Sequence, residues 1–211
     1  NGGALCLNNK KVMEKAKLLR SWGRSSSLYD DKSEKIENRF NIKLSGIDYD
    51  KKFVFEEIGY NLEGSEIGAS FGLVQLEKLK ENIKTRNLNF NIQNNFFKQH
   101  QEYFSVPVEN PKSKTAWLAY PILINDGAPF TRREFQIYLE KRNIQTRVVF
   151  TGNILRQPMC SNINKIVTKE GYPNSDKIMR DGVLLPVHHG MTKGMFRHLH
   201  ETINDFIATY S

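Results

Sequence analysis

The chain has 211 residues and a net charge of +8, with 39% hydrophobic and 26% charged residues. This composition excludes a disordered chain, and the length suffices to bury a core. The longest apolar run, residues 116–124, contains a proline and is far shorter than the roughly 20 residues of a membrane helix, so we predict no membrane partner.

The basic residues are spread over helical segments and interleaved with glutamates, as in "KKVMEKAKLLR" and "EKLKENIKTR". Such a distribution indicates solvated helix faces, and the sequence contains neither an aromatic RNA-binding signature nor zinc-finger spacing. We therefore predict no nucleic-acid partner. A basic chain can equally serve an anionic small substrate such as a nucleotide diphosphate.

Two cysteines, Cys6 and Cys160, lie far apart in the sequence. They form neither a disulfide framework nor a metal-ligand cluster, so we predict no metal site and a reducing, cytoplasmic location. The chain opens on "NGGALCLNN" without an initiator Met, and we expect it to be part of a longer protein.

The first elements are predicted from short patterns. Residues 3–7, "GALCL", are typical of a short buried strand, and Val12, Ala16 and Leu19 predict a helix that ends near residues 22–23. Residues 24–50 are polar and lack periodicity, which indicates a long surface loop.

Residues 59–65, "GYNLEGS", precede a long amphipathic helix. Ser65 is a suitable N-cap, but capping does not account for Asn61, which lies between Gly59 and Gly64. Two interpretations stay open for Asn61, a turn-forming residue or an amide presented to a ligand.

The helix after Ser65 is predicted to bury one apolar face and to continue into the polar segment 84–104. A stripe of six residues defines that face: Ile67, Phe71, Val74, Leu76, Leu79 and Ile83.

From about residue 115 strands and helices alternate. We predict strands at 116–124, 146–150 and 182–187. A capping box, Thr131 with Glu134, predicts a helix start, and Thr192 is expected to cap a C-terminal amphipathic helix. These elements predict a small α/β sandwich.

Four stretches together resemble the C-terminal half of the DegT/DnrJ/EryC1/StrS sugar aminotransferase family. They are "GGALCL", "FEEIGYNLEGSEIGASFGLVQLEKL", "TGNILRQP" and "NSDKIMRDGVLLPVHHGMT". The resemblance runs across almost the whole chain in order, and the last two stretches are similar to the branch of 4-keto-6-deoxyhexose 3-dehydratases.

The resemblance implies an α/β fold, the C-terminal part of a pyridoxal-phosphate-dependent transferase of aminotransferase fold type I. Residues 1–85 would end the large cofactor-binding domain and carry a dimer-interface helix, and residues 86–211 would form the small α/β domain. It further implies a homodimer in which Asn61 binds the phosphate of the pyridoxal 5'-phosphate held by the neighbouring subunit.

The resemblance also implies that a lysine forming a Schiff base with the cofactor lies just before the Gly-Gly-Ala strand, upstream of residue 1. Lys10 and Lys11 come after that strand and are not the anchor. No catalytic residue is therefore predicted within this chain. The implied substrate is a nucleotide-linked keto-sugar of surface polysaccharide or lipopolysaccharide synthesis, with glutamate as the amino donor.

A 3-dehydratase is the first alternative, because that branch has His at the anchor position. One type also binds an iron–sulfur cluster through cysteines that follow a Trp-Gly-Arg. Here Trp22-Gly23-Arg24 is followed by three serines, which favours amino transfer. A non-catalytic sugar-binding regulatory module of the same fold is the second alternative.

Arg147, Asn153 and Arg156 flank the segment "TRVVFTGNILRQP". Guanidinium groups at a strand end could clamp the diphosphate of the sugar nucleotide while Asn153 binds hydroxyls; the alternative is a surface loop. His188 and His189 follow a strand, where a structural role or a loop role near the substrate is open. The remaining histidines are expected to be solvated: His100, His198 and His200.

Overall fold

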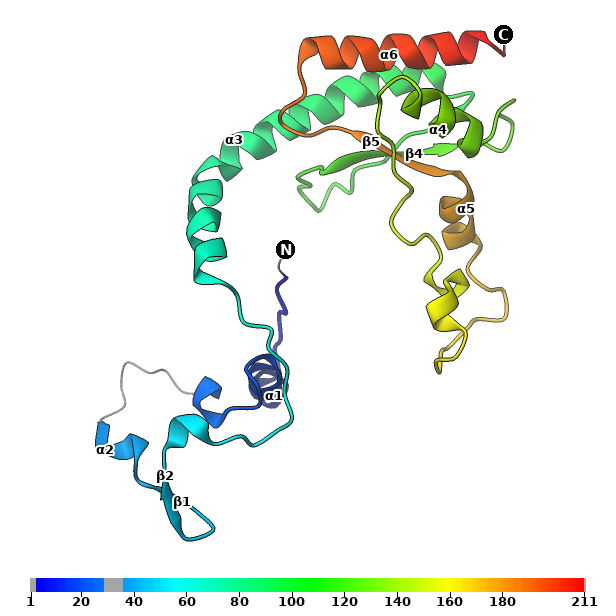
Figure 1. Cartoon of the computed structure of the whole chain (residues 1–211). Helices are drawn as coiled ribbons and strands as arrows, with labels where there is room; N and C mark the ends of the chain where they lie inside the picture. The colour runs from blue at the N-terminus through cyan, green and yellow to red at the C-terminus, as the bar shows by residue number, and fades with distance from the viewer. Residues whose placement is uncertain (1–2, 29–35, 211) are drawn as a thin grey trace. The chain divides into compact units, whose positions relative to one another are not determined.

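The computed structural model describes residues 3–28 and 36–210. The chain divides into two compact units between Gln75 and Leu76 (Figure 1). The long helix α3 (Glu66–Phe97) begins in the first unit and ends in the second, and the sequence-based division at residue 85 falls inside it. In the described residues no helix is long and apolar enough to cross a membrane.

The first unit begins with α1 (Lys10–Arg20), as predicted. Asn9 caps this helix, since its side-chain oxygen accepts a hydrogen bond of 3.2 Å from the backbone N–H of Val12. The helix ends at Arg20, and Trp22 and Gly23 just after it both have positive φ angles, of 58° and 82°. The left-handed backbone at these two residues turns the chain away from the helix axis.

The segment after α1 is more regular than its polar sequence indicates. It contains η1 (Ser25–Leu28), α2 (Ile36–Arg39) and an antiparallel hairpin of β1 (Ile42–Leu44) and β2 (Ile47–Tyr49), followed by η2 (Lys51–Phe53). The prediction of a loop over 24–50 was wrong for the hairpin. Ser45 and Gly46 connect its strands with positive φ angles, the turn geometry that suits the twist of a two-residue hairpin. Residues 29–35 of that prediction lie outside the described part.

The predicted strand at residues 3–7 is absent, and Leu5 and Cys6 are exposed. A strand exists only through hydrogen bonds to a neighbouring strand, and none of the described residues pairs with this segment. An apolar run therefore indicates only that a segment favours the extended conformation, and a strand forms only when a second strand pairs with it.

Helix α3 begins directly after Ser65, whose hydroxyl accepts a hydrogen bond of 3.4 Å from the N–H of Gly68. The helix is confirmed, but the predicted burial of its first apolar stripe was wrong, because Ile67 is 85% exposed and Phe71 is 69% exposed. Its second part buries Phe90 and Phe97. Periodicity determines which residues share a face, whereas burial also requires an element to cover that face.

The second unit is built on an antiparallel sheet in the order β3 (Phe104–Ser105), β4 (Ala119–Ile124) and β5 (Gly182–Pro186). Side chains alternate along β4, so that Tyr120, Ile122 and Ile124 are buried on one face. The strands predicted at 116–124 and 182–187 are confirmed with small shifts of their ends.

Three further helices surround the sheet: α4 (Arg132–Glu140), α5 (Pro173–Asp181) and α6 (Lys193–Ala208). Figure 1 shows α6 beside the C-terminal part of α3, and the core contains side chains of both helices, of α4 and of the buried face of the sheet. Single turns at Lys98–His100 (η3), Ile154–Arg156 (η4) and Pro158–Cys160 (η5) connect these elements. The unit is a sheet with packed helices, a mixed α/β sandwich as predicted.

Both predicted caps of this unit are confirmed. Thr131 and Glu134 form a complete capping box at the start of α4, and the Thr192 hydroxyl accepts from the N–H of Met195 at 3.2 Å at the start of α6. Phe135, on the first turns of α4, is fully buried.

The predicted strand at 146–150 was wrong. Only Arg147 pairs with β5, through one antiparallel bridge to Leu184, and the backbone then turns at Phe150 and Gly152, which have positive φ angles. The β-branched sequence favours an extended backbone. The turn that follows directly ends the pairing after one residue.

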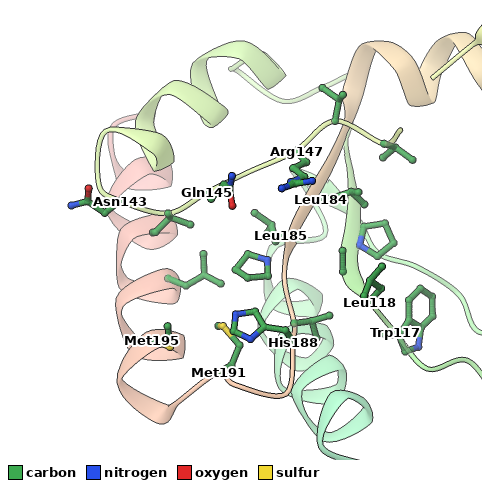
Figure 2. Close-up of a pocket in the computed structure, with 18 of the residues that line it drawn as sticks. Trp117, Leu118, Asn143, Gln145, Arg147, Leu184, Leu185, His188, Met191 and Met195 are labelled. Atoms are coloured by element: carbon green, nitrogen blue, oxygen red, sulfur yellow. The ribbon is translucent and has the colours of Figure 1, made fainter. Parts of the chain in front are cut away.

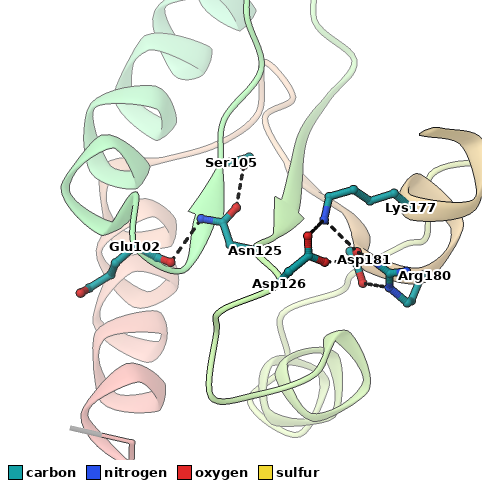
Figure 3. Close-up of polar contacts among 7 residues, drawn as sticks. All are labelled: Glu102, Ser105, Asn125, Asp126, Lys177, Arg180 and Asp181. Carbon is teal, nitrogen blue, oxygen red and sulfur yellow. Dashed lines mark hydrogen bonds and ion pairs between the residues drawn. The ribbon is translucent and has the colours of Figure 1, made fainter. Parts of the chain in front are cut away.

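Polar side chains at the end of β4 form hydrogen bonds and ion pairs with neighbouring elements (Figure 3). The Asn125 amide donates to the carbonyl of Glu102 at 3.2 Å, and its oxygen accepts from the Ser105 hydroxyl at 2.6 Å. Asp126 pairs with Lys177 at 2.7 Å and with Arg180 at 3.0 Å, and hydrogen bonding from Lys177 lowers the pKa of this aspartate. Asn125 thus joins the end of β4 to β3 and the residues just before it, and Asp126 joins the end of β4 to α5.

Candidate functional site

In the first unit, Asn61 lies on an extended segment that is hydrogen-bonded to the end of α1. The N–H of Tyr60 donates to Leu19 at 2.7 Å, and the N–H of Leu62 donates to Arg20 at 2.9 Å. Asn61 itself forms a backbone bridge with Ser21. Its side chain is exposed and makes no hydrogen bond to any described residue. The amide is thus held on a fixed backbone with its donors free.

The glycine before Asn61 has a packing role. A Cβ atom at Gly59 would lie 2.3 Å from the backbone nitrogen of Gly23, and one at Gly23 would lie 1.8 Å from the carbonyl oxygen of Glu57. The two segments therefore approach closely only because both residues are glycines. Gly59 thus allows the backbone of this segment to approach residues 22–23.

The serines after Trp22-Gly23-Arg24 make ordinary structural contacts. Ser25 is buried, and its N–H donates to the carbonyl of Val54 at 3.0 Å, while the Ser27 hydroxyl donates to the carbonyl of Arg24 at 2.7 Å. Among the described residues no three His, Cys, Asp or Glu side chains are grouped as metal ligands.

The second unit contains a cavity of about 1170 Å³ beside β5 and the start of β4. Its lining comes from the segment before β4, from residues 143–150, from β5 and its following loop, and from the first turns of α6. Figure 2 shows Arg147 beside Leu184, and His188 beside Met191, among the side chains of this lining. This volume is slightly above the range of roughly 300–1,000 Å³ that is usual for small-molecule sites.

Arg147 is the one Arg or Lys among the described residues that line this cavity, and the lining contains no Asp or Glu. The Arg147 side chain is exposed and has no hydrogen bond or ion pair within the described chain. Its backbone is held by two hydrogen bonds with Leu184, of 3.1 and 2.7 Å. A largely apolar cavity with a single unpaired cation favours an anionic ligand that also has apolar surface.

His188 adds a polar group to the same cavity. Its Nδ1 accepts a hydrogen bond of 3.2 Å from the N–H of Gly190, so the neutral ring carries its proton on Nε2 and keeps one donor. Two amides of α3 hold the backbone here: Asn89 donates to the carbonyl of His188 at 2.8 Å, and the buried Gln93 donates to that of Pro186 at 3.0 Å.

Gln93 is held in turn by His200 of α6, whose Nε2 lies 2.9 Å from the Gln93 side-chain oxygen. The His200 ring stacks on Phe96 with 3.9 Å between the ring centroids, and burial lowers the pKa of this histidine to about 4. The prediction that His200 is solvated was wrong, because α6 turns this position toward α3.

The other two predicted substrate residues, Asn153 and Arg156, lie outside the cavity lining. Both bind Asp176 of α5: the Asn153 amide donates to it at 2.7 Å, and the Arg156 Nη2 donates to it at 2.7 Å. The hydrogen bond from Arg156, followed by that from Asn153, lowers the pKa of Asp176 to about 2. Of the three, the structure places only Arg147 at the cavity.

Sequence reasoning gave no defined role to His188 and did not single out Gln145 or Trp117, which also line the cavity. His188 stands directly after a predicted strand, a position where ligand-binding side chains are common, and this was the available signal. Gln145 and Trp117 carried no such signal, since their segments come together only because β4 and the bridge at Arg147 both pair with β5.

Comparison with a protein-family model identifies the family of this chain. The model of the DegT/DnrJ/EryC1/StrS aminotransferase family matches residues 1–204. The chain belongs to this family. The resemblance noted in the sequence motifs is thereby confirmed over nearly the full chain.

Individual relatives in this family carry different names. The chain is 28% identical over 207 residues to the lipopolysaccharide biosynthesis protein RfbH of Salmonella typhimurium, covering 97% of this chain and 46% of that protein. It is 25% identical over 207 residues to the dTDP-4-amino-4,6-dideoxy-D-glucose transaminase of Shigella dysenteriae, covering 97% and 48%. The chain thus spans about half the length of these curated relatives.

Among solved structures, the chain superposes on Escherichia coli GDP-4-keto-6-deoxy-D-mannose-3-dehydratase with bound hydrated PLP. The TM-score is 0.76 at 20% identity, over 92% of this chain and 48% of that one. The predicted fold class, the C-terminal part of a PLP-dependent transferase of aminotransferase fold type I, is confirmed.

Proposed function

We propose that this chain is the C-terminal part of a pyridoxal-phosphate-dependent aminotransferase that acts on a nucleotide-linked keto-sugar in surface polysaccharide synthesis. The observation that carries the proposal is the cavity of the second unit, whose one Arg or Lys within the described lining is the unpaired Arg147. A diphosphate supplies the anion that such a cavity favours, and the attached groups supply the apolar surface.

The cofactor belongs to the same proposal. Pyridoxal phosphate serves as an electron sink for bonds to the carbon next to the reacting nitrogen. Asn61 fits this group, because its exposed amide has no partner among the described residues and is held on a hydrogen-bonded backbone. We assign Asn61 to the phosphate of the cofactor in the second subunit of a homodimer, and the lysine anchor to the sequence before residue 1.

The division of the chain follows from these assignments. Residues 1–85 end the cofactor-binding domain, and residues 86–211 form the small domain that contributes Arg147 and His188 to the sugar nucleotide. Arg147 pairs with the diphosphate, and the free Nε2–H of His188 donates to an oxygen of the substrate. Glutamate is the proposed amino donor, and the cytoplasm is the proposed location.

A 3-dehydratase without an iron–sulfur cluster is the second candidate, favoured by the similarity to the E. coli 3-dehydratase. Ser25 and Ser27 stand where a cluster would need thiolates, and their backbone and hydroxyl groups are used in structural hydrogen bonds. A non-catalytic sugar-binding module of the same fold is the third candidate, which a residue other than Lys or His at the anchor position would favour.

The test uses the whole enzyme with pyridoxal phosphate, glutamate and nucleotide-linked 4-keto-6-deoxyhexoses. Amino transfer yields one 2-oxoglutarate for each amino sugar. Loss of the 3-hydroxyl with no amino sugar formed, and with one glutamate converted to 2-oxoglutarate and free ammonia for each deoxygenated sugar, would instead establish the second candidate, because glutamate then supplies the two electrons that replace C–OH by C–H. Neither product, with sugar nucleotide still bound, would establish the third and refute an enzyme.

The role of Arg147 is tested in the same assay. Arg147→Gln removes the one Arg or Lys of the described cavity lining, so we expect KM for the sugar nucleotide to rise at least about tenfold, the order of a charge-assisted hydrogen bond. Arg133→Gln is the matched control, because Arg133 is an exposed arginine of α4 outside this cavity. Equal effects of the two variants would contradict the assignment.

A further inference from the structure

Phe150 combines three properties that seldom occur together. It lines the cavity, its side chain is 83% exposed, and its φ angle is +46°. A left-handed backbone is uncommon for any residue other than glycine and is a marked outlier for a bulky one. Core packing does not account for this conformation, because the ring is mostly in solvent and forms no aromatic pair with the described residues.

The strained backbone is held from the side of β5. Arg147 exchanges two hydrogen bonds with Leu184, which fix the chain three residues before Phe150. The N–H of Gly152 then donates to the carbonyl of Val149 at 3.0 Å and closes a turn around Phe150. The position of the ring is therefore set by its neighbours on both sides.

Helix α5 holds the other side of the loop. A Cβ atom at Gly152 would lie 2.5 Å from the Met179 side chain, so the loop is pressed against α5. Asn153 and Arg156 both donate to Asp176 at the start of that helix. These contacts keep the backbone in a conformation that Phe150 alone would not adopt, a pattern typical of ligand-binding positions.

We propose that Phe150 is a stacking platform for the base of a nucleoside diphosphate whose phosphates pair with Arg147. The assignment rests on the proposed function and adds the residue that recognises the nucleotide. Stacking needs an exposed aromatic face held in place, and pairing with a diphosphate needs a nearby unpaired guanidinium. Residues 147–150 supply both at one cavity. In this arrangement Asn153 and Arg156 are positioning residues, which act through Asp176 on the loop.

The test is calorimetric titration of the whole enzyme with uridine diphosphate, guanosine diphosphate and inorganic pyrophosphate. Phe150→Gly removes the ring and also relieves the left-handed strain. We expect the two nucleotides to bind at least about fivefold more weakly, the lower end of a stacking contribution, while pyrophosphate binds as before. The unfolding temperature of this variant should rise, whereas loss of a structural side chain would lower it.

Two further variants complete the experiment. Ser45→Gly is the control for backbone strain, since Ser45 has a φ angle of +51° in the hairpin of the first unit and does not line this cavity, and it should leave nucleotide affinity unchanged. Phe150→Trp keeps an aromatic face and should retain tight binding.

Unchanged nucleotide affinity in Phe150→Gly would overturn the stacking role, and so would an equal loss for pyrophosphate. Amino transfer by that variant with an unaltered KM would leave the proposed function standing and remove only this inference. Failure of the unsubstituted protein to bind any of the three probes would overturn both.

Discussion

Acidification is expected to loosen the packing between α3 and α6, because His200 is held there in its neutral form. Its Nε2 bonds to the Gln93 oxygen, its ring stacks on Phe96, and His100 is the nearby titratable group. In the folded protein the pKa of His200 is about 4, well below its ordinary value of 6.5. Between about pH 6.5 and pH 4, His200 is therefore protonated in the unfolded chain but neutral in the folded chain, so lowering the pH favours unfolding.

The gap between the two pKa values, at 1.36 kcal/mol per pKa unit, corresponds to about 3 kcal/mol. The ring is only partly buried, and solvent screening reduces this, so we expect a loss of about 1–2 kcal/mol. The contribution of neutral His200 is complete above pH 6.5 and disappears progressively down to pH 4.

Two measurements check this reasoning. Proton NMR of the imidazole rings should show one histidine titrating near pH 4, with its signal absent in His200→Gln. That variant keeps a side-chain N–H for Gln93 but does not titrate. Urea unfolding of the unsubstituted protein and of the variant between pH 4 and 7 therefore measures how much His200 protonation lowers the free energy of unfolding. A His200 ring that titrates near pH 6.5 in the folded protein would refute the argument, as would parallel pH profiles of the two proteins.

Three more predictions concern the framework of the two units. Thr131→Ala removes the capping box of α4 and should cost about 1 kcal/mol in urea unfolding, whereas Thr131→Ser should retain most of it. Gly59→Ala forces a Cβ against the backbone of Gly23 and should speed amide exchange at Leu62, whereas Gly64→Ala, which meets no atom within 4 Å, should not. Phe135→Ala empties a fully buried position and should lower the free energy of unfolding by about 3–5 kcal/mol; a loss below 1 kcal/mol would show that the core closes around the gap.

Several features follow from local sequence alone. The caps at Thr131 and Thr192, the start of α3 after Ser65 and the two longer strands were all predicted, because each depends on hydrogen bonds or alternation within a few residues. Membership of the family was likewise readable from sequence alone, through the motifs around Asn61 and in the C-terminal segments.

Tertiary contacts decided the rest. Residues 3–7 and 146–150 have strand-like sequences, yet the first has no pairing partner among the described residues and the second is turned away by the backbone at Phe150. Tertiary contacts also determine which predicted substrate residues lie at the cavity. Arg147 lines it, whereas Asn153 and Arg156 donate hydrogen bonds to Asp176, 20 or more positions along the chain. Local patterns specify which conformations a segment favours, and only contacts between distant segments determine which side chains remain free to bind a ligand.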